Sequence, residues 1–262
     1  MIASLLVASA AQVAALVCER ELLRLLGLPR GRALEGDLLD RAEGARDWYT
    51  RNGDPFVASR RLATSPRPSS EPCADVVRLE DGTELRSAVL ANRLAAGEAH
   101  ALVALAASAG TEVAAEAKRL WADERPDEAY FLDRFAVAVT ECLVFWASGD
   151  LCRTAEPAGE TLLAHLSPGC GHWDLADQHR VMAILTGEKS RRGTEETVRL
   201  GPIEMLPSGA LRPQHSVLAV LGVTHRKGTT TPEDLCRACD FDPCGFRRAP
   251  YAAVGLRTLE IS

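Results

Sequence analysis

Aromatic side chains are scarce in this sequence, and the short motifs that mark several large enzyme classes are missing. Only 5% of its 262 residues are Phe, Trp or Tyr. No G-x-S-x-G, P-loop or G-x-G-x-x-G occurs, so hydrolase, NTPase and dinucleotide-dependent activities have no motif to support them. The six histidines form no H-E-x-x-H or H-x-H pattern. A histidine-built catalytic metal site is therefore unsupported by motif.

An excess of basic charge is also absent. Lys and Arg number 30 against 36 Asp and Glu, which gives a formal net charge of −6. Basic residues cluster only in short pairs such as Arg191-Arg192 and Arg247-Arg248. A nucleic-acid partner is not expected, because binding to phosphates needs a basic patch. With 47% apolar residues, the chain can bury a sizeable core.

The apolar run from Ile2 to Cys18 lacks the basic residues that precede the hydrophobic part of an export signal. It continues directly into the charged stretch CERELLRLLGL. We therefore expect a buried helix that ends near Gly27, and neither a signal peptide nor a membrane span. Eight cysteines, five of them dispersed, are more typical of a reducing compartment than of a disulfide scaffold. The expected localisation is cytoplasmic, with no membrane partner.

A Pro- and Ser-rich stretch, TSPRPSSEPCAD, follows residue 63 and reads as an exposed connection. Before it, the apolar spacing of EGDLLDRAEGARDWYTRNG predicts a second helix, so residues 1–63 are expected to form a helical N-terminal arm. Residues 75–225 then form the main body, and residues 226–262 form a cysteine-containing C-terminal tail. The apolar helices of the arm could pack on the body or on a second chain, which leaves a homodimer open.

The body alternates strand-like and helical patterns. DVVRLEDGTELRS predicts a hairpin that turns at Asp81-Gly82. His100 to Ala107 reads as a buried strand, a helix begins at about Thr111, and PDEAYFLDRFAVAVTECLVFWAS reads as a long apolar helix. Short β-like runs follow in ETVRLGPIEML and SVLAVLGVTH. The mixture predicts an α+β fold, in which an antiparallel or mixed sheet is packed against helices.

The stretch SPGCGHWDL, which begins at Ser167, places a constrained Pro-Gly turn before a predicted helix. Backbone N–H groups at such a turn can bind an anion, and glycine allows a ligand to approach closely. The stretch could therefore hold a carboxylate. The alternative is an ordinary turn in which Asp174 caps the helix.

A longer segment, SPGCGHWDLADQHRVMAIL, resembles the S-P-G-Y-G-x-W-x-L-x-x-Q stretch of the activation (reactivation) domain of cobalamin-dependent methionine synthase, which binds S-adenosylmethionine. VRLEDGTELRSAVLANRL, ALVALAASAGTEVAAEAKRL, DRFAVAVTECL and IEMLPSGALRPQHSVLAVLGV are similar to further stretches in the same order, over about residues 75–225. The resemblance implies an activation-domain-like fold. It also implies an accessory role in corrinoid-dependent methyl transfer or its reactivation, with cobalamin carried by a partner corrinoid protein or methyltransferase subunit.

The same resemblance implies a ligand-binding set. Glu141 stands at the position of the family glutamate that recognises the ligand's ammonium, although a partly exposed helix glutamate is the alternative. His165 replaces the family's arginine and Cys170 its tyrosine, so the grip on the ligand is altered. No catalytic residue is expected, because the chemistry belongs to the cofactor. The candidate ligand-binding residues are Glu141, His165, Ser167, Pro168, Gly169, Cys170 and Gly171.

The C-terminal tail contains CRACDFDPCGFRR, which carries Cys236, Cys239 and Cys244 in a C-x2-C-x4-C pattern. Thiolates at this spacing can bind zinc or an iron–sulfur cluster, and a cluster could relay the electron that cobalamin reactivation needs. The alternatives are reduced, partly buried cysteines or a redox pair of the first two. A metal would need a fourth ligand, and the candidates are His225, Cys152, Cys170, water or a partner.

Two functions therefore compete at this stage. The first is an S-adenosylmethionine-binding accessory protein of a cobalamin-dependent methyltransferase system. The second is a non-catalytic metal- or iron–sulfur-binding partner module that has lost the S-adenosylmethionine grip at His165 and Cys170. A third, a methyltransferase with its own acceptor, would need a base, for which His172 is the candidate.

Overall fold

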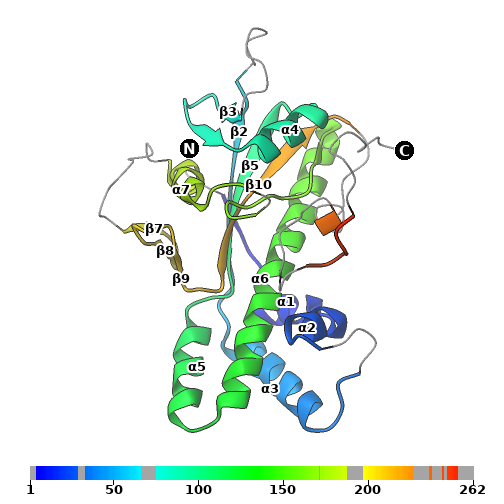
Figure 1. The fold of residues 1–262 in the computed structure, drawn as a ribbon, viewed down its shortest axis with the longest axis vertical. Helices are drawn as coiled ribbons and strands as arrows, with labels where there is room; N and C mark the ends of the chain where they lie inside the picture. The colour runs from blue at the N-terminus through cyan, green and yellow to red at the C-terminus, as the bar shows by residue number, and fades with distance from the viewer. Residues whose placement is uncertain are drawn as a thin grey trace.

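A five-stranded antiparallel sheet, in the order β1-β2-β5-β10-β6, lies at the centre of the protein (Figure 1). The computed structural model describes residues 4–28, 33–65, 75–170, 172–187, 197–226, 236–237, 244 and 247–252. The strands of the central sheet are β1 (Ser4–Leu6), β2 (Phe56–Ala63), β5 (Ala101–Ser108), β6 (Thr161–Leu162) and β10 (Ser216–Thr224). Strand β5 pairs along its whole length with β2 on one side, and along nearly all of β10 on the other.

Two smaller antiparallel sheets flank the central one. Their strands are β3 (Val76–Arg78) with β4 (Glu84–Arg86), and β7 (Val198–Leu200) with β8 (Ile203–Met205) and β9 (Leu211–Arg212). The β3–β4 pair is the hairpin predicted at Asp81-Gly82, and Gly82 has a φ of +85°. Such a φ favours glycine, because a side chain there would meet the backbone.

Helices cover both faces of the central sheet. They are α1 (Ala10–Leu16), α2 (Glu19–Leu25), α3 (Asp37–Asn52), α4 (Ala88–Ala96), α5 (Glu112–Ala122), α6 (Pro126–Ala155) and α7 (Gln178–Thr186). Alternate residues of β5 belong to two different hydrophobic cores. Val103 and Leu105 lie in the core that is formed with α1, α2, α3, α5 and α6. Leu102 and Ala104 lie in the core that is formed with α4, α7 and the small sheets. This alternation follows from the period of two along a strand. The predicted α+β fold is confirmed.

Helix α6 is the longest element and forms much of one core. By length and composition alone it could cross a membrane, but a core helix has the same properties. Phe135, Val139 and Leu143 along it are fully buried in the protein. The apolar character of α6 is therefore accounted for by packing against the sheet and the other helices.

The N-terminal segment differs from the single helix expected up to Gly27. Ser4–Leu6 is instead strand β1, which pairs with β2, and two short helices follow it. The break has a local cause: the Ser9 side chain accepts a hydrogen bond from the Gln12 backbone while the Gln12 side chain reaches back to Ser9, which starts a new helix. The division into residues 1–63, 75–225 and 226–262 stays a prediction, but β2 inside the first part is an interior strand of the central sheet.

Candidate functional site

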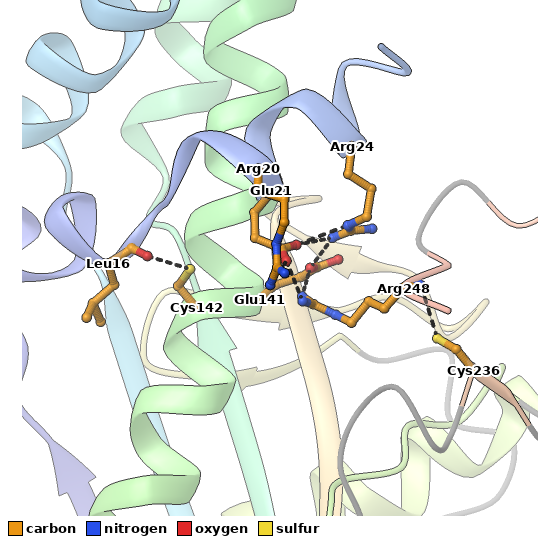
Figure 2. Close-up of polar contacts among 8 residues, drawn as sticks. All are labelled: Leu16, Arg20, Glu21, Arg24, Glu141, Cys142, Cys236 and Arg248. Atoms are coloured by element: carbon orange, nitrogen blue, oxygen red, sulfur yellow. Dashed lines mark hydrogen bonds and ion pairs between the residues drawn. The ribbon is translucent and has the colours of Figure 1, made fainter. Parts of the chain in front are cut away.

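Glu141 lies on α6, and two arginines that are distant in the sequence bind its carboxylate (Figure 2). Arg24 of α2 donates to Glu141 Oε2 at 2.6 Å, and Arg248 from the C-terminal segment donates to the same oxygen. Glu21 pairs with both arginines, each at 2.9 Å. Only 14–22% of each of the four side chains is exposed. We call Glu21, Arg24, Glu141 and Arg248 the Glu141 network.

The charges of the Glu141 network alternate, so each ion has counter-ions beside it. Burial raises the pKa of the Glu141 carboxyl, and the neighbouring Arg24 and Arg248 oppose that shift. A buried carboxylate without such partners would pay a large desolvation cost. The network therefore holds a carboxylate in a place that suits a cationic group.

The thiol beside Glu141 is not activated. Cys142 donates to the Leu16 carbonyl at 3.7 Å, and burial, followed by the charge of Glu141, raises its pKa to about 11. The thiolate is the form that reacts and binds metals. Cys142 is therefore a structural residue of the α1–α6 contact.

Phe145 connects the Glu141 network to His165. The Arg248 guanidinium lies over the Phe145 ring, 4.7 Å from its centroid, and the His165 ring meets Phe145 edge-on at 5.6 Å between centroids. Burial, and then the positive charges of Arg248 and Arg93, lower the pKa of His165 to about 4. The imidazole is neutral at pH 7, so it cannot supply the positive charge that an arginine would bring to an anionic ligand.

The turn at Ser167–Cys170 is closed by its own backbone hydrogen bonds. Gly169 N–H donates to the Trp173 carbonyl at 2.7 Å, and Cys170 N–H donates to the Ser167 carbonyl at 3.0 Å. Pro168 is buried, and Gly169 has a φ of +92°, which requires glycine. These two N–H groups therefore serve the turn in this conformation. Gly171 lies outside the described residues.

The segment after the turn is tied to the β3–β4 hairpin through a buried carboxylate that the sequence did not single out. Asp177 accepts from the Trp173 indole at 2.8 Å and from the Arg86 backbone at 2.6 Å, and it also pairs with Arg180. Asp174 caps a 3-10 turn at Leu175–Asp177 by accepting from the Ala176 backbone, and α7 begins only after that turn. Trp173, Asp174 and Asp177 of the motif thus stabilise the local fold between the turn and α7.

Cys236 lies next to Arg248. Its sulfur accepts a hydrogen bond from the Arg248 backbone N–H at 3.3 Å, and Arg247 donates to the Cys236 carbonyl at 2.9 Å. Cys244 is partly buried, and Cys239 lies outside the described residues. Cys236 and Glu141, which the sequence treats as parts of separate sites, therefore both contact Arg248.

The remaining predicted residue near the turn is His172. It is exposed and has a φ of +65°. Non-glycine residues adopt this region infrequently. The structure places it on the surface directly after the turn, and its suggested role as a base stays a prediction.

No family model matches the sequence, and no curated protein matches it. Among solved structures, the crystal structure of the MetH reactivation domain bound to AdoHcy is similar, with a TM-score of 0.62 at 13% sequence identity. The similarity covers 87% of this chain and 80% of that chain. The protein has the fold of the MetH reactivation domain. This agrees with the resemblance carried by the SPGCGHWDL motif and its neighbours, although likeness at this identity establishes the fold alone.

Proposed function

We propose that this protein binds S-adenosylmethionine, or its demethylated product, beside Glu141 and His165, and that it assists corrinoid-dependent methyl transfer or its reactivation. The observation that carries the proposal is Glu141 itself: a mostly buried carboxylate, paired with cations, on α6 of a reactivation-domain fold. A similar domain has been crystallised with AdoHcy.

The ligand's ammonium would take the place of Arg248 on Glu141. One cation replaces another, so the carboxylate stays paired throughout the exchange. The ligand's carboxylate needs a second cation, because His165 is neutral at pH 7. Arg93 of α4 is close enough to lower the pKa of His165, and a guanidinium can grip a carboxylate through two hydrogen bonds. We assign that task to Arg93.

Calorimetric titration of S-adenosylmethionine into the full-length chain tests this arrangement. Removing the competing cation with Arg248→Gln should tighten binding, whereas Glu141→Gln should weaken it about tenfold or more, since hydrogen bonds to charged groups contribute about 1.5–3 kcal/mol. Arg20→Gln is a matched control. The Arg20 side chain is 84% exposed, and its guanidinium makes only a long contact of 3.9 Å to Glu21 at the edge of the network. Equal affinity of wild type and Glu141→Gln would exclude this site.

The partner would be a corrinoid protein, and this chain would contribute positioning without a catalytic residue of its own. Reactivation consumes one electron from a reductant and one methyl group from S-adenosylmethionine, and it releases AdoHcy. We expect this protein to accelerate AdoHcy formation by a reduced corrinoid protein in proportion to its concentration. If the protein binds S-adenosylmethionine but does not accelerate AdoHcy formation, the corrinoid role is excluded and only the binding role remains.

A second candidate function is a metal- or iron–sulfur-binding partner module without the S-adenosylmethionine grip. Two observations favour it: Arg24 and Arg248 already occupy Glu141, and the N–H groups of Gly169 and Cys170 are bonded within the turn. This function predicts no binding of S-adenosylmethionine by wild type or Arg248→Gln. It also predicts metal bound by the cysteine tail in protein purified without oxygen.

The double variant His165→Arg/Cys170→Tyr separates the two functions further. It restores the residues that the family carries at both positions. Tighter S-adenosylmethionine binding by this variant would mean that the pocket persists and has been retuned. Absence of binding, together with iron or zinc in the anaerobic protein, would favour the partner module.

A further inference from the structure

Three side chains of the kinds that can bind a metal, from distant parts of the sequence, lie close together where three strands of the central sheet end. Figure 1 shows this end of the sheet beside α4. His100 directly precedes β5, Glu160 directly precedes β6, and His225 directly follows β10. Because these strands are antiparallel, all three positions fall at the same end of the sheet. One ligand atom of each residue lies within 4.8 Å of the other two, and no other such set of His, Cys, Asp or Glu occurs among the described residues.

The backbone holds these three residues in place. His100 N–H donates to the Val223 carbonyl at 3.0 Å, and Glu160 N–H donates to the Ala155 carbonyl at 3.3 Å. The His100 and His225 rings stack 4.7 Å apart with an angle of 12° between their planes. The strand ends and the contact between the two rings therefore fix the positions of the side chains that could bind a metal.

The hydrogen bond of His225 resembles that of a metal-binding histidine. His225 Nδ1 lies 3.3 Å from the Gly159 carbonyl, which can only accept, so this hydrogen bond places the hydrogen on Nδ1. In that tautomer of the neutral ring, the lone pair is on Nε2. Such a bond from the second ring nitrogen to a carbonyl commonly orients a metal-binding histidine. His100 Nε2 shares a hydrogen with Glu160 Oε1 at 2.8 Å, and a metal ion would replace that hydrogen between the two ligand atoms.

A cation already occupies the carboxylate of this cluster. Arg61 of β2 donates to both oxygens of Glu160, at 2.6 and 2.7 Å. The Glu160 side chain is only 8% exposed, but that of Arg61 is 48% exposed and can turn into solvent. The exposed Arg61 guanidinium is partly screened by solvent, and an incoming cation would keep the buried Glu160 carboxylate paired during the exchange. Arg226 points elsewhere, to the Ala96 carbonyl and Glu98.

We propose that His100, Glu160 and His225 bind a divalent ion of the zinc type, and that Arg61 takes the place of that ion in its absence. Two imidazole nitrogens and one carboxylate oxygen, with water as the fourth ligand, suit Zn²⁺. Tetrahedral coordination separates ligand atoms by roughly 3.4 Å. This spacing lies between the 2.8 Å contact and the 4.8 Å limit of the cluster, so small side-chain rotations suffice.

Cobalt(II) titration followed by visible absorption tests the site, with zinc competition to measure the zinc affinity. The background is the full-length chain with Cys236, Cys239 and Cys244 changed to serine, so that the tail cannot bind the metal. We expect one cobalt ion per chain with a d–d band and no thiolate charge-transfer band. His100→Ala and His225→Ala should each weaken binding about tenfold or more, and His172→Asn is the matched control.

Arg61→Met gives a readout that loss of folding cannot imitate, because removing the competing cation should tighten cobalt binding several-fold. The proposal is overturned if cobalt binds the His100→Ala/His225→Ala double variant as tightly as the background. It is also overturned if neither the background nor the Arg61→Met variant binds cobalt or zinc.

Discussion

His165 packs edge-on against Phe145, and Arg248, which pairs with Glu141, lies over the same ring. The surroundings of His165 and of Glu141 determine the charge of each. Burial keeps the His165 imidazole neutral near pH 7, whereas Glu141 has two guanidiniums beside it. A histidine at an arginine position is therefore not a weaker arginine here. It removes a charge from the site, and under the proposed function the ligand's carboxylate would need a cation on another element.

The pH dependence of stability should report the partly buried imidazole of His165. His165 has a pKa of about 4 in the folded protein against an ordinary value of 6.5. In the unfolded chain it takes up a proton as the pH falls below 6.5, while in the folded protein it does not, so stability decreases as the pH falls toward 4. The effect has an upper limit of about 3 kcal/mol.

Urea unfolding of wild type and His165→Asn between pH 7 and roughly 4.5 measures this contribution. The difference in free energy of unfolding between the two should shrink as the pH falls. His172→Asn, which changes an exposed histidine, should keep the wild-type slope. Asp133 and Glu160, whose pKa values are lowered to about 2, also lose stabilising free energy as the pH falls toward their ordinary values of 3.8 and 4.5, but both are present in the wild type and the variant, so their contributions cancel from the difference. A slope unchanged by His165→Asn would contradict the prediction.

The Glu141–Arg248 pair should show direct coupling. Because both side chains are mostly buried and share a hydrogen bond, a double-mutant cycle with Glu141→Gln and Arg248→Met should give a coupling free energy of about 1–3 kcal/mol. Chemical denaturation of the four proteins provides the measurement. Additive effects would mean that Arg248 is held by Glu21 and Phe145 and gains nothing from Glu141.

The sequence predicts Glu141 as a site residue, but it cannot predict what binds it. Arg24 is 117 positions away and Arg248 is 107 positions away. No local pattern relates such residues, and only packing of α2 and the C-terminal segment against α6 brings them together. The same holds for His100 and Glu160, which are 60 positions apart.

At the scale of elements, the predictions that succeed depend on neighbouring residues. Helix α3, the β3–β4 hairpin and helix α6 agree with expectation because capping, turn and spacing signals lie within each segment. Strand β1 was missed because Ser4–Leu6 is extended only through pairing with β2, more than 50 residues later. Tertiary pairing overrides the helix preference of an Ala- and Leu-rich run.

Tyr49 should measure how firmly α3 is attached to the sheet. Its hydroxyl is fully buried and donates to the Ala109 carbonyl, directly after β5, at 2.9 Å. Tyr49→Phe leaves that carbonyl unpaired and should lower the free energy of unfolding by about 1–3 kcal/mol. Tyr130→Phe is the control, since that hydroxyl lies 3.5 Å from the Leu26 carbonyl on a residue that is 45% exposed. Equal effects of the two substitutions would contradict the assignment.

At the scale of the whole molecule, the Glu141 network joins an N-terminal helix, the longest helix and the C-terminal segment (Figure 2). Arg248→Gln should therefore speed amide exchange in residues 247–252, whereas amides of β5, paired on both sides, should exchange as in wild type. Exchange followed by mass spectrometry checks this. Uniform acceleration throughout the chain would indicate global destabilisation instead of local release.

The strand order of the central sheet also governs how the protein can be made. Strand β10 is the last strand of that sheet in the sequence, yet it lies between β5 and β6 and pairs with both. During synthesis the chain emerges from its N-terminus, so β5 and α6 leave the ribosome before the strand that completes their sheet. A nascent chain without residues 216–224 exposes apolar surface along β5 and α6. We expect such a chain to be bound by chaperones, and folding to finish only after Thr224 has emerged.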